Sequence, residues 1–163
     1  HNIIEHSLIH HFSDDTNLLY SSSSLKKINK HINHDLKLIV HWLRANRISL
    51  NVDKTEIIMF RPKRKAINKN LNFRISGQKI KPTTHTKYLG LILDEHLTWS
   101  LHLNMMKMKL SRANGLLSKL RYYCSPQLTR TTYFAIFESH LRYGCQIWGQ
   151  SKSQIFKEIE ALQ

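Results

Sequence analysis

The stretch HHFSDDTNLLY, residues 10–20, places two adjacent aspartates, Asp14 and Asp15, between two apolar runs. The flanking segments 7–11 and 16–20 contain residues that strands accept. Ser-Asp-Asp is typical of a turn, because these side chains bond the local backbone. We therefore predict a β-hairpin with carboxylates at its tip, in a chain that has only 11 acidic residues among 163.

The two aspartates have two interpretations, and the local sequence does not choose between them. In the first, they are solvated turn formers. In the second, they bind Mg²⁺ or Mn²⁺, because these ions prefer carboxylate oxygens and a hairpin holds the ligands in place. Neighbouring strand residues point to opposite faces, so one carboxylate would bind the metal directly, and we favour Asp14 over Asp15 for that role.

Basic residues outnumber acidic residues by 25 to 11, which gives a formal net charge of +14. With 41% apolar residues the chain can fold, and its charge predicts a polyanionic partner, with nucleic acid favoured over an anionic membrane. Nine Lys or Arg and no acid lie between Glu56 and Asp94. A metal site beside such a surface is typical of nucleotidyl transfer, whereas the surface alone would only bind nucleic acid.

The sequence contains no apolar run of membrane-spanning length and no signal-peptide pattern. We therefore expect an intracellular protein, in the nucleus or the cytoplasm, that is not secreted and has no membrane partner. Cys124 and Cys145 are too few for a disulfide framework, and we expect both to be reduced, half-buried packing residues. The chain starts at His1 rather than Met and stops within the helix-like FKEIEALQ, so we expect a fragment.

The first part of the chain predicts one helix and several strands. Ser21–Ser24 suit a helix N-cap, and apolar residues then recur every three or four positions from Leu25 to Leu43. This spacing predicts an amphipathic helix of about twenty residues. The other expected elements are a polar turn at Asn51–Lys54, a buried strand at Thr55–Phe60, a tight hairpin around Gly77 and a strand at Lys87–Asp94.

The second part of the chain predicts helices. Apolar residues from Leu103 to Leu120 alternate steps of three and four, which indicates an amphipathic helix. A second helix is predicted from an N-cap at Ser125 to about Arg142. Strands followed by helices indicate an α+β fold.

FSDD, residues 12–15, resembles the F-A-D-D hairpin motif of reverse transcriptases, with Ser13 in place of the usual Ala. WLRANRISLNVDKTEIIMF, KYLGLILDEHLTW and YGCQIWG follow in an order similar to that of non-LTR (LINE, jockey-like) retrotransposon polymerases. The resemblance extends over nearly the whole chain. It implies a partial polymerase palm, built of antiparallel hairpins and a helix, in residues 1–97, and a truncated helical thumb in residues 98–163.

The resemblance also implies roles for single residues. Asp14 and Asp15 would be two of the family's three metal-binding carboxylates. Lys54, in NVDKTE, would be the motif D lysine, a candidate general acid for the departing pyrophosphate, although an exposed lysine is otherwise a solvated charge. The motif E primer grip, a hairpin whose backbone positions the primer end, would contain Tyr88, Leu89 and Gly90.

The helices after residue 98 would hold duplex by its phosphates, which gives affinity without reading the base sequence. For each cation the alternative is a solvated charge on a helix face. The implied nucleic-acid-binding residues are Lys107, Lys109, Arg112, Lys119 and Arg121.

The resemblance implies an RNA-directed DNA polymerase that extends a DNA primer on an RNA template with deoxynucleotide triphosphates, by metal-dependent transfer with Mg²⁺ or Mn²⁺. In the family, the third carboxylate, the nucleotide-binding helix and the fingers precede the aspartate hairpin, and the nine residues before it contain no counterpart of them. We therefore expect the isolated chain to bind nucleic acid without polymerising. The alternative function is a non-catalytic, basic nucleic-acid-binding remnant.

Eleven histidines raise the question of a zinc site, and His31 and His34 share one face of the predicted helix. No cysteine or second histidine pair completes a zinc set in the sequence, so we do not predict one. We expect Trp42, Trp99 and Trp148 to anchor the core rather than to stack on bases.

Overall fold

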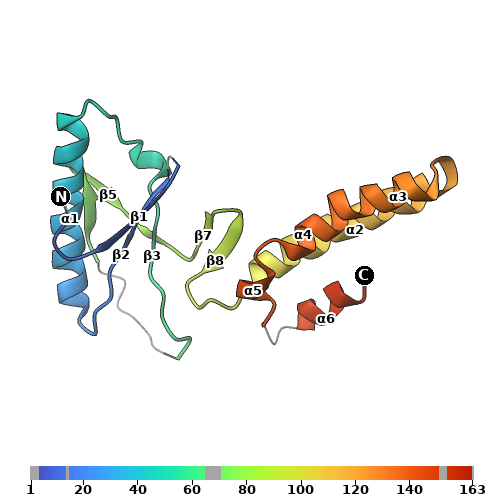
Figure 1. Cartoon of the computed structure of the whole chain (residues 1–163). Coiled ribbons are helices and arrows are strands. Elements are labelled where there is room, and N and C mark those ends of the chain that lie inside the picture. The colour runs from blue at the N-terminus through green and yellow to red at the C-terminus, as the bar shows by residue number, and fades with distance from the viewer. Residues whose placement is uncertain (1–3, 14, 65–70, 151–153, 163) are drawn as a thin grey trace. The chain divides into compact units, whose positions relative to one another are not determined.

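The structure is a computed structural model that describes residues 4–13, 15–64, 71–150 and 154–162. It forms two compact units (Figure 1). The first unit comprises His1–Met59 and Lys63–Thr83, and the second comprises Phe60–Pro62 and Thr84–Gln163. Both helices and strands are present, in small sheets that are mostly antiparallel, which is compatible with the predicted α+β class. The division into palm and thumb portions after residue 97 stays a prediction.

The aspartate hairpin opens the first unit. Strands β1, Leu8–Phe12, and β2, Asp15–Leu19, pair antiparallel, with Phe12 opposite Asp15 beside the turn. Ser13, in the turn, has a φ of 56°, the left-handed conformation that tight hairpin turns require. The predicted hairpin is therefore confirmed, while Asp14 lies outside the described residues.

Helix α1, Leu25–Ala45, has 21 residues and confirms the predicted helix. It begins where the Ser24 side chain accepts a hydrogen bond from the Lys27 backbone N–H, a standard N-cap. Leu36 of this helix forms the buried core of the first unit with Ile75 and Ile80. Partly buried side chains surround this core: Leu18, Ile32, Val40, Val52 and Ile57.

A second hairpin packs against α1 and consists of β4, Phe73–Ile75, and β5, Gln78–Ile80. Gly77 has a φ of 85° in its turn, as the sequence predicts. The Asn33 side chain of α1 accepts a 2.9 Å hydrogen bond from the Arg74 N–H and donates one of 2.8 Å to the carbonyl of Asn72. The helix thus satisfies backbone groups along β4 that would otherwise be left at a sheet edge.

The predicted buried strand at Thr55–Phe60 is largely wrong. Only β3, Ile57–Ile58, is a strand, and it is half-buried and pairs in parallel with β6, Pro82–Thr83. Pro82 begins β6 opposite Ile57 and has no N–H to donate, which weakens this end of the ladder. Before β3, the polar turn predicted at Asn51–Lys54 is present as the short 3₁₀ helix η1, Val52–Lys54.

The second unit contains a hairpin at Lys87–Asp94, where the local pattern predicts a single strand and the family resemblance implies a hairpin. Strands β7, His85–Tyr88, and β8, Leu91–Asp94, pair antiparallel around Leu89 and Gly90. These two turn residues have φ angles of 44° and 79°. Such turns usually have Asn or Gly at the first of these positions. Because leucine occupies that position here, the local pattern predicts a continuous strand instead of a turn.

Helices form the rest of the second unit. The long helix α2, Ser100–Tyr123, is followed by a helical run that returns along it: α3, Pro126–Tyr133, the π-helical turn η2, Phe134–Glu138, and α4, Ser139–Arg142 (Figure 1). The sequence predicts this run but not its π turn. Two short helices follow, α5, Cys145–Trp148, and α6, Gln154–Glu160, which contacts α2. The buried core contains Leu91, Leu103, Met106, Leu110, Ala113, Phe137, Trp148 and Ile159.

Two expectations about single side chains need correction. Trp148 is buried and Trp99 packs against the core, but Trp42 is 40% exposed and is not among the core residues of the described part of the chain. Cys124 and Cys145 are both free thiols, and Cys124 is half-buried as expected, but Cys145 is exposed. Among the described residues, no helix is both long enough and apolar enough to cross a membrane.

Candidate active-site elements

Asp15 is the first residue of β2 and lies beside the hairpin turn, where its side chain is exposed. Next along the ladder, the His11 ring and the Thr16 hydroxyl lie 3.1 Å apart and link the two strands by a hydrogen bond. The short turn holds the Asp15 backbone in place and leaves its carboxylate oxygens in solvent. This arrangement suits a hard divalent cation, whose preferred ligands are carboxylate oxygens. The role of Asp15 stays a prediction, as does that of Asp14.

Lys54 ends the helix η1, and its side chain is exposed. The Asn51 side chain accepts a 3.3 Å hydrogen bond from the Lys54 backbone N–H, and the Thr55 hydroxyl donates one of 3.0 Å to the Asn51 carbonyl. These bonds order the backbone of the turn, and the role of Lys54 as a general acid stays a prediction.

The β7–β8 turn is covered by Tyr143, which sequence reasoning did not select. The Tyr143 hydroxyl donates a 2.6 Å hydrogen bond to the carbonyl of Leu89, and a Cβ at Gly90 would lie 3.2 Å from Tyr143 Cε1. Gly144 has a φ of 64°, and a Cβ there would lie 3.0 Å from Leu91 Cδ2. The first two residues of YGCQIWG therefore pack onto the predicted primer-grip hairpin, and only contact between distant segments could have revealed it.

Asp94, at the end of β8, organises the start of α2. Its Oδ2 accepts hydrogen bonds from the Thr98 N–H at 2.9 Å, the Thr98 hydroxyl at 3.1 Å and the Trp99 N–H at 3.0 Å, and its Oδ1 accepts one from the His96 N–H. Burial raises the pKa of Asp94, but the hydrogen bonds from Thr98, His96 and Trp99 outweigh it, and the pKa is lowered overall. The ionised carboxylate thus fixes the junction of hairpin and helix.

Residues 60–62 belong to the second unit because Arg61 is bound there. Arg61 Nε lies 3.1 Å from Glu95 Oε2, and both side chains are mostly buried. The Arg61 backbone N–H also donates to the Glu95 carbonyl at 2.9 Å, and the His96 ring contacts the Arg61 carbonyl at 2.9 Å. This partly buried ion pair holds Arg61 against the base of the β7–β8 hairpin.

His102 is a buried histidine on α2 that the sequence does not single out. Its Nδ1 accepts a 3.4 Å hydrogen bond from the Ile92 N–H, and its ring centre lies 6.3 Å from that of Trp99 and 5.8 Å from that of Trp148. Burial lowers the pKa of His102, and the charge of Lys109 lowers it further. His102 is therefore a neutral core side chain that joins α2 to the hairpin.

The predicted phosphate-binding cations on α2 differ in their surroundings. Lys109, Arg112 and Lys119 are exposed. Lys107 Nζ instead lies 2.6 Å from Glu158 Oε2 in an ion pair. The Arg121 guanidinium lies 5.0 Å from the centre of the Tyr122 ring, at the end of the helix. Lys109, Arg112 and Lys119 therefore present the most accessible charges of the set.

No protein-family model matches this chain, and no solved structure matches it. Curated proteins do match it, among them several RNA-directed DNA polymerases of transposable elements. The chain is similar to proteins of this class over nearly its whole length, which confirms the resemblance that its motifs indicate.

The particular relatives are RNA-directed DNA polymerases from transposons and a mobile element of Drosophila melanogaster. The probable RNA-directed DNA polymerase from transposon X-element is 29% identical over 161 residues, which cover 96% of this chain and 17% of that protein. The corresponding protein from transposon BS is 26% identical over 96% of this chain. The RNA-directed DNA polymerase from mobile element jockey is 25% identical over 98% of it. The chain spans about 17% of the length of these relatives.

Proposed function

We propose that this chain is part of an RNA-directed DNA polymerase of a non-LTR retrotransposon and carries a portion of its palm and its thumb. One observation carries the proposal: the aspartate hairpin, the Lys54 turn, the β7–β8 hairpin and the helical run follow in family order in a chain aligned to such polymerases over 96% of its length. Residues 1–97 would be palm and residues 98–163 thumb. The intact protein would act inside the cell, in the nucleus or the cytoplasm.

In this proposal, Asp14 and Asp15 hold Mg²⁺ or Mn²⁺ at the hairpin turn. A bound divalent cation would stabilise the charge that develops during phosphoryl transfer from a deoxynucleotide triphosphate. The exposed carboxylate of Asp15 and the tight turn that carries it fit such a cation. Lys54 would donate a proton to the departing pyrophosphate from its exposed position.

The second unit would hold the primer and the template. The backbone at Leu89 and Gly90, kept in place by Tyr143, would position the primer end. The exposed charges of Lys109, Arg112 and Lys119 would contact phosphates of the RNA–DNA duplex, with affinity that falls as salt is raised.

The catalytic proposal is tested in the longest reading frame that contains this chain, by cDNA synthesis on an RNA template with Mg²⁺. We expect Asp14→Asn and Asp15→Asn each to lower the rate of cDNA synthesis by at least about a hundredfold, because loss of a ligand would weaken binding of the metal that stabilises charge in the transition state. Glu160→Gln is the control, since Glu160 is an exposed acid on α6. Undiminished synthesis in both aspartate variants would exclude the catalytic role.

A second candidate function, nucleic-acid binding without catalysis, is favoured by the net charge of +14. The two candidates differ in what the parent protein does, but both expect the isolated chain to bind a primer–template duplex. We expect gel-shift binding that weakens with salt, and no primer extension by the chain alone with Mg²⁺. Extension under these conditions would contradict the expectation that upstream elements are required.

A further inference from the structure

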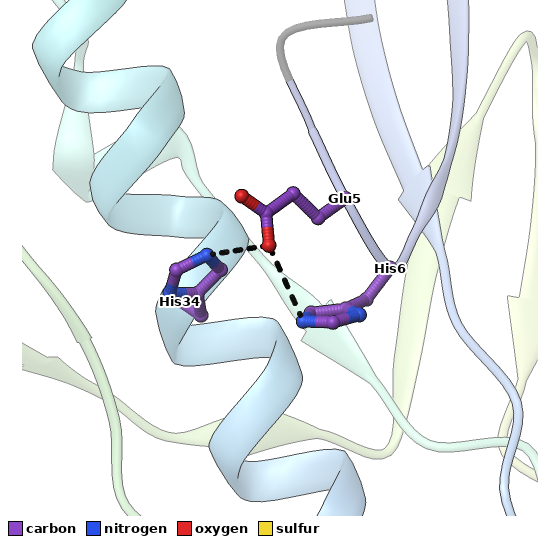
Figure 2. A group of neighbouring side chains, drawn as sticks. All are labelled: Glu5, His6 and His34. Atoms are coloured by element: carbon purple, nitrogen blue, oxygen red, sulfur yellow. Dashed lines mark ion pairs between the residues drawn. The ribbon is translucent and has the colours of Figure 1, made fainter.

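Three potential metal ligands meet where the segment before β1 lies against α1. Figure 2 shows Glu5 and His6 of that segment facing His34 of the helix. Glu5 Oε2 lies 3.2 Å from His34 Nε2 and 3.9 Å from His6 Nε2, and the three ligand atoms all lie within 4.8 Å of one another. Two imidazole nitrogens and a carboxylate oxygen thus converge on one point at the surface.

A buried aspartate fixes this arrangement. Asp35, the neighbour of His34 on α1, is fully buried. Its Oδ1 accepts a 3.3 Å hydrogen bond from the Glu5 N–H, and its Oδ2 accepts one of 2.5 Å from the Ser7 hydroxyl. These bonds hold the backbone on both sides of His6 against the helix. The ligands are therefore positioned by contacts that do not use the ligand atoms themselves.

His31, one turn before His34, supports the ring of His6. The two ring centres lie 3.8 Å apart with the planes at 77°, and the centre of the Tyr20 ring lies 5.5 Å from that of His31. His31 therefore packs edge-on against His6 and limits how that ring can turn.

We propose that Glu5, His6 and His34 form a binding site for a divalent transition metal, with Zn²⁺ the best match. Zinc binds His nitrogen and carboxylate oxygen at about 2.0–2.2 Å in tetrahedral geometry, which places its ligands about 3.3 Å apart. The observed separations of 3.2 and 3.9 Å are close to this value. Because all three residues are exposed, the fourth position would be open to water.

This site is distinct from the proposed Mg²⁺ site in place and in chemistry. Strand β1 separates the two, and its five residues at about 3.4 Å each span roughly 17 Å. Magnesium prefers oxygen ligands, whereas imidazole favours zinc and its neighbours in the transition series. The sequence could not indicate the site. His34 has no further ligand near it in the sequence, and the other two ligands, Glu5 and His6, come from a separate segment.

The test is a Zn²⁺ titration of the complete chain by calorimetry at pH 7.5, with Co²⁺ as a spectroscopic probe. We expect one metal per chain, a rise in melting temperature with Zn²⁺, and visible Co²⁺ absorption of four-coordinate strength. His34→Gln, His6→Gln and Glu5→Gln should each weaken Zn²⁺ binding by at least about tenfold. His41→Gln is the matched control, since His41 is exposed on the same helix, and it should bind like the wild type.

Two further results discriminate the site from adventitious binding. Lowering the pH should weaken Zn²⁺ binding, because histidine binds metal only as the neutral imidazole, and excess Mg²⁺ should not compete. Far-UV circular dichroism of each variant checks that it is folded. Equal Zn²⁺ affinity in wild type and in folded His34→Gln and His6→Gln would overturn the proposal, as would equal losses in these variants and His41→Gln.

Discussion

The Tyr143 hydroxyl donates a hydrogen bond to the carbonyl of Leu89, across 54 residues of sequence. Leu89 has a φ of 44°, an uncommon conformation for a leucine. The bond therefore holds a turn whose own sequence favours it poorly. It also links YGCQIWG to KYLGLILD, two segments that carry the family resemblance.

Removing that hydroxyl should loosen the turn. Tyr143→Phe keeps the ring and loses one hydrogen bond, so we expect the free energy of unfolding to fall by about 1 kcal/mol. Urea denaturation measures this loss. In the proposed polymerase we expect weaker use of a primer end with little change in RNA binding. A variant with wild-type stability would show that the bond contributes nothing in solution.

Two glycines offer an opposed pair of substitutions. Gly90→Ala should lower stability by about 1–2 kcal/mol, because Gly90 has a φ of 79° and its new Cβ would lie 3.2 Å from Tyr143 Cε1. Gly115→Ala should raise stability by about 0.5–1 kcal/mol, since Gly115 lies within α2 and a Cβ there has no neighbour within 4 Å. Chemical denaturation of both should give changes of opposite sign, and matching signs would contradict the turn geometry.

His102 predicts how stability depends on pH near neutrality. Its pKa is lowered from 6.5 in the folded chain, so the unfolded chain binds protons more readily between the two values. The contribution of neutral His102 to stability is fully present above pH 6.5. It should be lost as the pH falls below 6.5 and through the lower pKa of the folded chain. His102→Asn, which can still accept a bond near Nδ1 but does not titrate, should flatten this dependence. Identical dependence of stability on pH in the wild type and in His102→Asn would refute this role of His102.

Asp94 predicts a separate loss at acid pH. Because its pKa is lowered from 3.8, its contribution is present above pH 3.8 and should be lost as the pH falls through the lower folded value. Asp94→Asn should cost about 2 kcal/mol at pH 7, since charged hydrogen bonds to the start of α2 are lost. Thermal denaturation at pH 7 and pH 3 should show a smaller difference between variant and wild type at the lower pH.

The cations of α2 should differ in their contribution to nucleic-acid binding. Each of three substitutions should weaken duplex binding: Lys109→Gln, Arg112→Gln and Lys119→Gln. Each should also lower the number of ions released on binding, taken from the slope of affinity against salt concentration, by about one. Lys107→Gln should weaken it less, because Lys107 is already paired with Glu158. Fluorescence anisotropy over a range of salt measures both quantities. A larger loss at Lys107 than at Lys119 would reverse the ranking that the structure supports.

Local patterns predicted most helices and two hairpins, because their information lies within a few residues. The α1 helix follows from its N-cap and periodicity, and the Gly77 turn follows from glycine. The sequence was less informative about features that depend on contacts between segments far apart in the chain. The β3 ladder has only two residue pairs and begins at Pro82, which has no N–H to donate, and Trp42 is exposed while the core of its unit forms around Leu36.

The candidate site shows the same division. The hairpin that carries Asp15 could be predicted from its turn residues, and the structure confirms it. Tyr143 and the metal-ligand cluster could not be predicted, because each joins segments far apart in the chain. Glu5 reaches His34 only because buried Asp35 binds the segment before β1.

The π turn η2, Phe134–Glu138, has a consequence for comparing this chain with its relatives. A π turn closes with a hydrogen bond one residue longer than that of an α turn, and one residue turns an α-helix by about 100°. The extra residue of the π turn therefore rotates every later side chain, including that of Tyr143, about the helix axis relative to its position in a regular α-helix. A relative with a regular helix here would present a different side chain to the hairpin, so alignments should allow a one-residue gap within Phe134–Glu138.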